Sequence, residues 1–116
     1  MNDSFDQREF RNALGRFATG VTVITTLGAD GKAEGITANS FGALSLNPPL
    51  ILWCVGKIAP THQSFMTCSH FAVNVLRADQ LELSNQFATP SEDKFVGVEW
   101  HEGIDGVPLL KNVLAC

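Results

Sequence analysis

The chain begins with a helical pattern of hydrophobic positions. Apolar residues recur at spacings of three and four at Phe10, Ala13, Leu14 and Phe17. This periodicity predicts an amphipathic helix of about four turns that ends near Gly20 and packs one side on a core. Asp3 and Ser4 precede the pattern and belong to the residue types that cap helix N-termini.

Extended patterns follow the predicted helix. The run 21–27 is rich in β-branched residues and predicts a strand. The Asp-Gly pair at 30–31 favours a hairpin turn, so the run 35–44 is predicted as the second strand. After a break at 47–49, the run 50–55 is apolar without alternation, which is typical of a strand buried on both faces.

Short helices alternate with strands in the second half. We expect a helix over 60–68, a strand over 71–76 and a helix over 80–87 that Asp79 caps. This order favours a mainly antiparallel sheet or barrel over a doubly wound parallel sheet, because a hairpin joins the first two strands. The segment 110–116 starts the pattern of another strand, so we expect further residues or a partner chain to complete the fold.

Composition is that of an ordinary globular domain. The chain has 116 residues, of which 45% are hydrophobic, and this fits one domain with one core. Only 17% are charged, and so thin a charged surface suggests that a partner covers some apolar surface. The formal net charge of −4 argues against nucleic-acid binding through a basic face.

The chain carries no sign of membrane insertion, secretion or a metal site. Its longest apolar run, 48–55, is far shorter than the roughly 20 residues of a membrane span. The N-terminus is acidic and polar, unlike a signal peptide. The three cysteines form no close pair and the three histidines lack metal-ligand spacing, so we expect a cytoplasmic protein without a bound metal.

The run 35–42 is the first segment with candidate binding residues. Its small residues allow a ligand to approach the backbone closely. Thr37, Asn39 and Ser40 add hydrogen-bonding groups that are costly in an apolar strand unless something pairs with them. An exposed polar edge strand would show the same spacing.

The run 54–61 is the second candidate segment. It leaves the apolar strand and places Lys57 and Thr61 before a predicted helix, a combination that can hold a phosphate; a solvated loop is the alternative. Asn74 lies within an apolar strand and needs a partner from the backbone, water or a ligand. Because the Rossmann, P-loop and nucleophile-elbow motifs are all absent, the residues alone lead to no reaction.

The order of these segments resembles the flavin reductase-like family, the small reductase components of two-component flavin monooxygenases. The resemblance covers nearly the whole chain. It is carried by the segments 10–21, 35–41, 45–50, 71–76, 93–95 and 106–110, together with Gln80, Leu83, Ser84, Phe87 and Ala88.

The resemblance implies a fold that is mainly β with helices, the Greek-key-like FMN-binding split β-barrel. Residues 1–116 would form a single flavin reductase-like domain, truncated at the C-terminus. Members of the family usually continue through a Gly-Asp-His segment, associated with nicotinamide binding, and through the closing strands of the barrel.

The resemblance also implies an enzyme: an NAD(P)H:flavin oxidoreductase. It would be a homodimer in which NADH or NADPH reduces FMN, or FAD in its place, for a partner monooxygenase. No catalytic side chain follows, because the protein positions the cofactor that carries the chemistry. The residues expected to bind flavin are Thr37, Ala38, Asn39, Ser40, Cys54, Val55, Gly56, Lys57, Thr61 and Phe87, with Lys57 and Thr61 assigned to the phosphate.

Other functions remain open at this point. The segment 57–61 departs from the Ser-rich loop that many members of the family carry. A flavin-binding protein without nicotinamide turnover and a fragment without a function of its own are the alternatives. A relative of the haem or pyridoxine-phosphate oxidases on the same fold is a more distant one.

Overall fold

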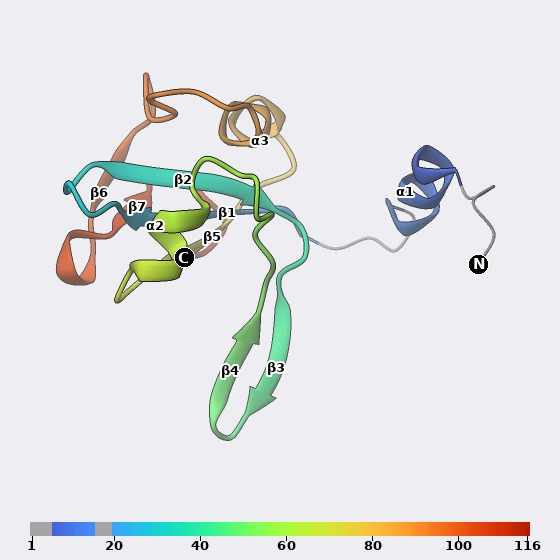
Figure 1. Cartoon of the computed structure of the whole chain (residues 1–116), viewed down its shortest axis with the longest axis horizontal. Helices are drawn as coiled ribbons and strands as arrows, with labels where there is room; N and C mark the ends of the chain where they lie inside the picture. The colour runs from blue at the N-terminus through green and yellow to red at the C-terminus, as the bar shows by residue number, and fades with distance from the viewer. Residues whose placement is uncertain (1–5, 16–19) are drawn as a thin grey trace.

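The computed structural model describes residues 6–15 and 20–116 (Figure 1). Its elements, in chain order, are α1 (Gln7–Gly15), β1 (Thr22–Leu27), β2 (Ala33–Ala38), β3 (Gly42–Leu46), β4 (Pro49–Leu52), α2 (His62–Thr67), β5 (Ala72–Val75), α3 (Leu81–Ala88), β6 (Trp100–Glu102), the 3-10 turn Ile104–Gly106 and β7 (Pro108–Leu110). The prediction of a mainly β fold with helices is confirmed.

A three-stranded antiparallel sheet in the order β2-β1-β5 forms the centre of the molecule. Its middle strand, β1, is buried along almost its full length although half of it is threonine. A buried hydroxyl must be hydrogen-bonded, and each of these donates to a backbone carbonyl. Thr22, Thr25 and Thr26 donate to the carbonyls of Ala38, Pro108 and His70 at 2.6–2.7 Å.

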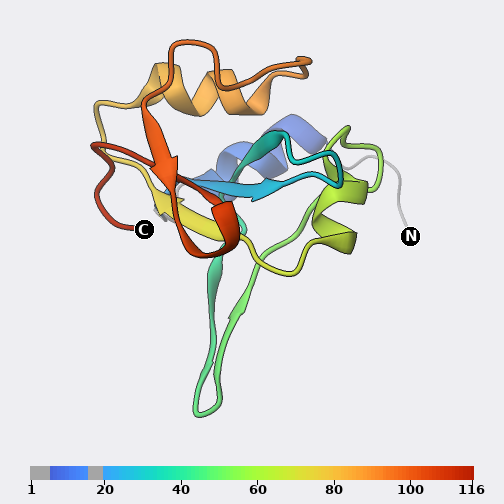
Figure 2. The same ribbon diagram turned by 90° about the vertical axis from the view of Figure 1, so that its left-hand side faces the viewer.

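Successive residues of β1 supply the two faces of this sheet. Val23 packs in a cluster with Phe87 of α3, whereas Ile24 packs in a second cluster with Phe65 of α2. Figure 2 shows α3 along one side of the sheet and α2 near the turn that joins β1 and β2. At Gly35 of β2, an added Cβ would lie 2.8 Å from the Phe87 ring, so this glycine lets α3 approach the sheet closely.

Asn74 finds its partners in the backbone and in a neighbouring hydroxyl. Its side chain is fully buried, and Nδ2 donates to the Val23 carbonyl at 2.8 Å and to the Thr25 hydroxyl at 3.1 Å. Its Oδ1 accepts the backbone N–H of Leu110 at 3.0 Å. Asn74 therefore joins β1, β5 and β7 and is a structural residue.

The prediction of a strand buried on both faces at 50–55 is wrong. Only residues up to Leu52 are extended, and all of β4 is exposed. The reason is visible in Figure 1, where the β3–β4 hairpin projects away from the central sheet and no other layer covers it. The predicted strand 35–44 is likewise split into β2 and β3, because the chain leaves the central sheet after Ala38 to enter this hairpin.

The N-terminal helix differs from its prediction. Asp6, rather than Asp3 or Ser4, caps α1, because its Oδ1 accepts the backbone N–H groups of Arg8 and Glu9. Phe10, on the predicted apolar stripe, is 49% exposed and Ala13 is exposed too. Asp3, Ser4, Phe17 and the predicted continuation towards Gly20 lie outside the described residues, as does the side chain of Leu14.

The later elements follow the prediction more closely. Helices α2 and α3 and strand β5 occupy the expected segments. Asp79 does not cap α3, however; Gln80 is the residue before the helix, and the Asp79 carboxylate accepts a hydrogen bond from Arg77. The β6–β7 hairpin was not predicted.

The strands of the described residues form three separate sheets and no closed barrel. The split barrel implied by the resemblance is therefore not seen. The expected strand at the end of the chain is reduced to one bridge, in which Val75 pairs with Ala115. Among the described helices, none is long and apolar enough to cross a membrane. Residues 6–15 and 20–116 contain no cluster of His, Cys, Asp or Glu suited to a metal ion.

Candidate functional site

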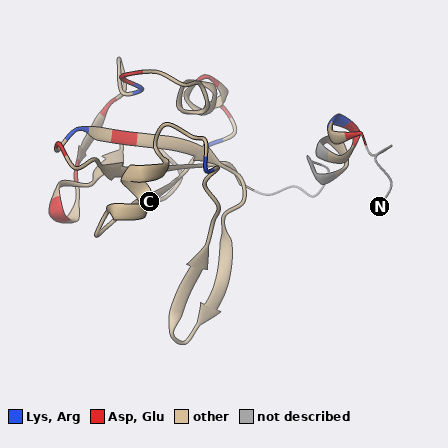
Figure 3. Ribbon diagram, viewed as in Figure 1, with Lys and Arg blue, Asp and Glu red and all other residues tan. Residues whose placement is uncertain are grey.

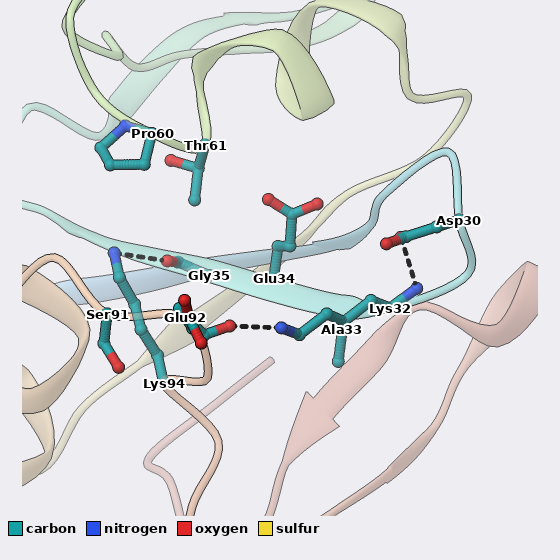
Figure 4. Close-up of a pocket in the computed structure, with 10 residues that line it drawn as sticks. All are labelled: Asp30, Lys32, Ala33, Glu34, Gly35, Pro60, Thr61, Ser91, Glu92 and Lys94. Carbon is teal, nitrogen blue, oxygen red and sulfur yellow. Dashed lines mark hydrogen bonds between the residues drawn. The ribbon is translucent and has the colours of Figure 1, made fainter.

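A cavity of about 210 Å³ opens beside the outer edge of β2 (Figure 4). It lies between the turn after β1, the start of α2 and the loop that follows α3. Ligand pockets usually have volumes of roughly 300–1,000 Å³, so this cavity fits one end of a larger molecule. Its lining residues are Asp30, Lys32, Ala33, Glu34, Gly35, Pro60, Thr61, Ser91, Glu92 and Lys94.

Thr61 has a buried hydroxyl that the protein leaves without a partner. The residue is 5% exposed, and its Oγ1 makes no hydrogen bond with the described residues. The hydroxyl oxygen of a threonine just before a helix normally accepts a hydrogen bond from the helix N–H groups, yet Thr61 makes no such bond with α2. Figure 4 shows the Thr61 side chain at the cavity between Lys94 and Glu34, with its hydroxyl turned towards Pro60 in this view. A buried hydroxyl without a protein partner is left for a water or a ligand atom.

Lys94 brings a buried positive charge to the same cavity. It is 8% exposed, and Nζ donates to the carbonyls of Gly35 at 3.1 Å and Phe87 at 2.9 Å. Since an ammonium group has three protons, one remains for a ligand. Burial lowers the pKa of Lys94, and the Glu34 carboxylate raises it in partial compensation. The combination of this ammonium with the Thr61 hydroxyl is suited to an anion.

The rest of the lining carries charges of both signs. The Glu34 carboxylate accepts a hydrogen bond from the Ser64 hydroxyl at 2.6 Å, which fixes it from the side of α2. The Lys32 ammonium donates to the backbone carbonyl of Glu92, and the Asp30 carboxylate accepts the backbone N–H of Lys32 at 3.0 Å. The turn after β1 is thus tied to the loop after α3 across the cavity mouth.

The first predicted segment is placed at the end of β2. Thr37 donates its hydroxyl to the Ser84 carbonyl and so faces α3, whereas Ala38 is buried in the cluster against α2. Asn39 and Ser40 are exposed where the strand ends. The Ser40 hydroxyl accepts the backbone N–H of Cys54 at 3.0 Å, so the structure brings the two predicted segments together.

The second predicted segment runs from that contact towards the cavity. Cys54 and Gly56 are exposed, and Val55 packs against the cluster under α2. Thr61 lines the cavity. Lys57 is exposed and is not among the residues that line the cavity.

Phe87 is a core residue, contrary to the expectation that it lines a flavin pocket. Its side chain is fully buried, with its ring centroid 5.0 Å from that of Phe95. The physical reason is that Phe87 is on the face of α3 that packs on Gly35 of the sheet. Only its backbone carbonyl reaches the candidate site, through Lys94.

Lys94 and Glu34 are the residues that sequence reasoning missed. Lys94 belongs to the segment 93–95, which contributed to the resemblance without being given a role. No local signal marked Lys94, because its burial depends on the backbone carbonyls of β2 and α3 that it reaches in the folded protein. Glu34 gave no signal, since a single glutamate on a strand after a turn is most often solvated.

Known proteins share both the sequence and the fold. The family model named flavin reductase like domain matches residues 14–116. FMN reductase (NADH) SmoA of Agrobacterium fabrum is 44% identical over 110 residues, which cover 95% of this chain and 62% of SmoA. The flavin-dependent monooxygenase reductase subunit HsaB of Mycobacterium tuberculosis is 41% identical over 115 residues, covering 99% of this chain and 61% of HsaB.

A solved structure gives the same result. Streptomyces globisporus NADH:FAD oxidoreductase SgcE6, in complex with NAD and FAD fragments, superimposes with a TM-score of 0.86 at 43% identity. The match covers 98% of this chain and 68% of SgcE6. The chain spans less than two thirds of the length of the curated relatives compared, from 35% to 64%. By its match over 103 of its 116 residues, counted from 14 to 116, the chain belongs to the flavin reductase like domain family.

Proposed function

We propose that this chain acts in the NAD(P)H-dependent reduction of FMN, with FAD as the alternative flavin, and that the reduced flavin serves a partner monooxygenase. Family membership supports this proposal, as do the names of SmoA, HsaB and SgcE6. The observation that carries it is the unpartnered Thr61 hydroxyl beside the Lys94 ammonium in one cavity.

The residues present fit the phosphate end of a flavin. A phosphate monoester carries a charge of about −1.5 to −2 near neutral pH and accepts several hydrogen bonds. Thr61 would donate its hydroxyl to it, and Lys94 would supply the positive charge and its remaining proton. The small volume of the cavity agrees with a site for the phosphate rather than for the whole cofactor.

The ring end of the flavin would lie along the two predicted segments where they meet. Asn39 and Gly56, which lie in sequence close to the Ser40–Cys54 contact, are exposed. These residues would bind and orient the ring edge through polar and backbone groups. The bound flavin supplies the hydride-accepting chemistry, so we assign no acid or base to a side chain.

A second copy of the chain is part of this proposal. Lys57 is the one Asp, Glu, Lys or Arg between Glu34 and Arg77. Figure 3 shows the β3–β4 hairpin without any charged residue along it. Leucine and isoleucine side chains are exposed on this hairpin, with Leu46 91% exposed. Apolar surface of this kind marks an interface, and we assign it to a homodimer contact.

The remaining parts of the proposal concern context. We treat residues 1–116 as part of one flavin reductase-like domain, supported by a family match that runs through both halves of the chain. The described cysteines are all free, which is consistent with a reducing, cytoplasmic location.

The test is an assay of NADH oxidation by the purified chain, with and without added FMN, beside a titration of FMN fluorescence. The proposal predicts turnover that depends on added flavin. Binding of FMN without turnover would support a flavin-binding protein instead, and absence of both would refute the flavin proposals together.

A further inference from the structure

We propose that Glu34 weakens phosphate binding in the cavity and thereby keeps the flavin exchangeable. This inference rests on the proposed function and deepens it. It assigns to one residue the property that separates a flavin substrate, which must leave after reduction, from a permanently held cofactor.

Glu34 is fixed in the wall of the site. It is half-buried on β2, next to Gly35, and the Gly35 carbonyl accepts a hydrogen bond from the Lys94 ammonium. The Ser64 hydroxyl donates to its carboxylate at 2.6 Å, so the charge is held in the cavity rather than free to turn into solvent. Figure 4 shows the carboxylate to one side of the Thr61 side chain, with Lys94 on the other side, and all three residues line the same cavity.

Glu34 acts on the same ammonium group that a phosphate would use. Its carboxylate stabilises the charged form of Lys94 against the effect of burial. A phosphate that enters the cavity is repelled by this carboxylate, which lines the same cavity as Lys94. Like charges brought together in a partly desolvated site cost binding free energy.

The other charged groups of the lining do not cancel this effect. Asp30 and Glu92 add two carboxylates at the mouth of the cavity, and the Lys32 ammonium is already bonded to the Glu92 carbonyl. The lining thus holds three carboxylates against two ammonium groups. Lys94 and Thr61 attract an anion, whereas the three carboxylates around them repel it.

The decisive variant is Glu34→Gln, which removes the charge and keeps the shape and the bond to Ser64. We expect it to bind FMN about three- to tenfold more tightly, the change that follows from removing one like charge at a half-buried site. Release of FMN in stopped-flow fluorescence should slow by a similar factor. Inorganic phosphate should compete better with FMN, whereas the affinity for riboflavin, which has no phosphate, should stay the same.

Glu82→Gln is the matched control, because Glu82 is an exposed glutamate on α3 that does not line this cavity. Thermal unfolding of both variants establishes that they are folded. The inference is overturned if Glu34→Gln binds FMN no more tightly than the wild type, or if riboflavin affinity rises equally. If FMN binds to neither protein, the proposed function fails, and this inference fails with it.

Discussion

At the scale of single residues, the site depends on two groups whose bonding capacity the protein does not use up. Lys94 donates to two carbonyls and keeps one proton, and Thr61 makes no hydrogen bond through its hydroxyl. Polar groups in this state are costly in a folded protein unless a ligand or water completes them. Their presence in one cavity is the observation on which the proposed phosphate site rests.

Replacing Lys94 by methionine should lower FMN affinity by about tenfold or more, because a hydrogen bond to a charged group contributes roughly 1.5–3 kcal/mol. Fluorescence titration measures the change, with riboflavin as the ligand that should be affected least. Lys111→Met, at an exposed lysine after β7, is the control and should bind FMN as the wild type does. Equal FMN affinity in both variants would remove Lys94 from the site.

The pKa of Lys94 predicts how FMN binding changes with pH. Burial lowers this pKa from its ordinary value of 10.5, so the ammonium loses its proton at a lower pH than an exposed lysine does. The neutral amine no longer attracts a phosphate, and FMN affinity should therefore fall as pH rises towards 10.5. Titrations of FMN binding from neutral pH up to pH 10.5 should show the fall in affinity in the wild type and not in Lys94→Met. A flat profile in both would contradict the role of the ammonium.

Thr61 was predicted as a phosphate residue from the sequence, and Lys94 was not. A threonine beside a predicted helix start is a local signal, and the structure places it in the cavity. The burial of Lys94, in contrast, depends on β2 and α3 meeting around it, which no local pattern records. Lys57 was predicted for the phosphate together with Thr61, but its side chain is exposed and does not line the cavity.

At the scale of elements, the strands of the central sheet and the turn between β1 and β2 could be predicted from the sequence, whereas the β3–β4 and β6–β7 hairpins could not. A β-branched run identified β1, which is almost entirely buried, and a hydrophobic run identified β5, which is half-buried apart from the buried Asn74. The run 50–55 has the composition of a buried strand, but its extended part, β4, is exposed in a hairpin. Composition favours a strand, but it does not show which other part of the fold covers that strand. The three-residue strands β6 and β7 are too short to show a period.

A substitution at Asn74 tests how β1, β5 and β7 are held together. Asn74→Ala should destabilise the protein by about 2–3 kcal/mol, because the Leu110 N–H loses its acceptor in a buried place and the bonds to β1 disappear. Urea unfolding measures the loss. Asn85→Ala, at an exposed position of α3, should change stability by less than about 0.5 kcal/mol. Similar effects of the two substitutions would show that the buried network has no special role.

At the scale of the whole molecule, the uncharged β3–β4 hairpin determines the expected assembly. Leu46→Glu places a charge where a second copy would bury a leucine, and it should shift a dimer towards monomer. Sedimentation or light scattering measures the mass. Val96→Glu, at an exposed valine after Phe95 and outside the hairpin, is the control. An unchanged mass for both variants would exclude the hairpin as the dimer contact.

The most direct test of the whole account is the Thr61→Val variant, titrated with FMN and with riboflavin. Valine keeps the shape and removes a hydroxyl that has no partner, so stability should stay within about 1 kcal/mol of the wild type or rise. FMN affinity should fall about three- to tenfold, the effect of one lost hydrogen bond, while riboflavin affinity should not change. If Thr61→Val binds FMN as tightly as the wild type, the cavity does not hold the flavin phosphate and the account is wrong.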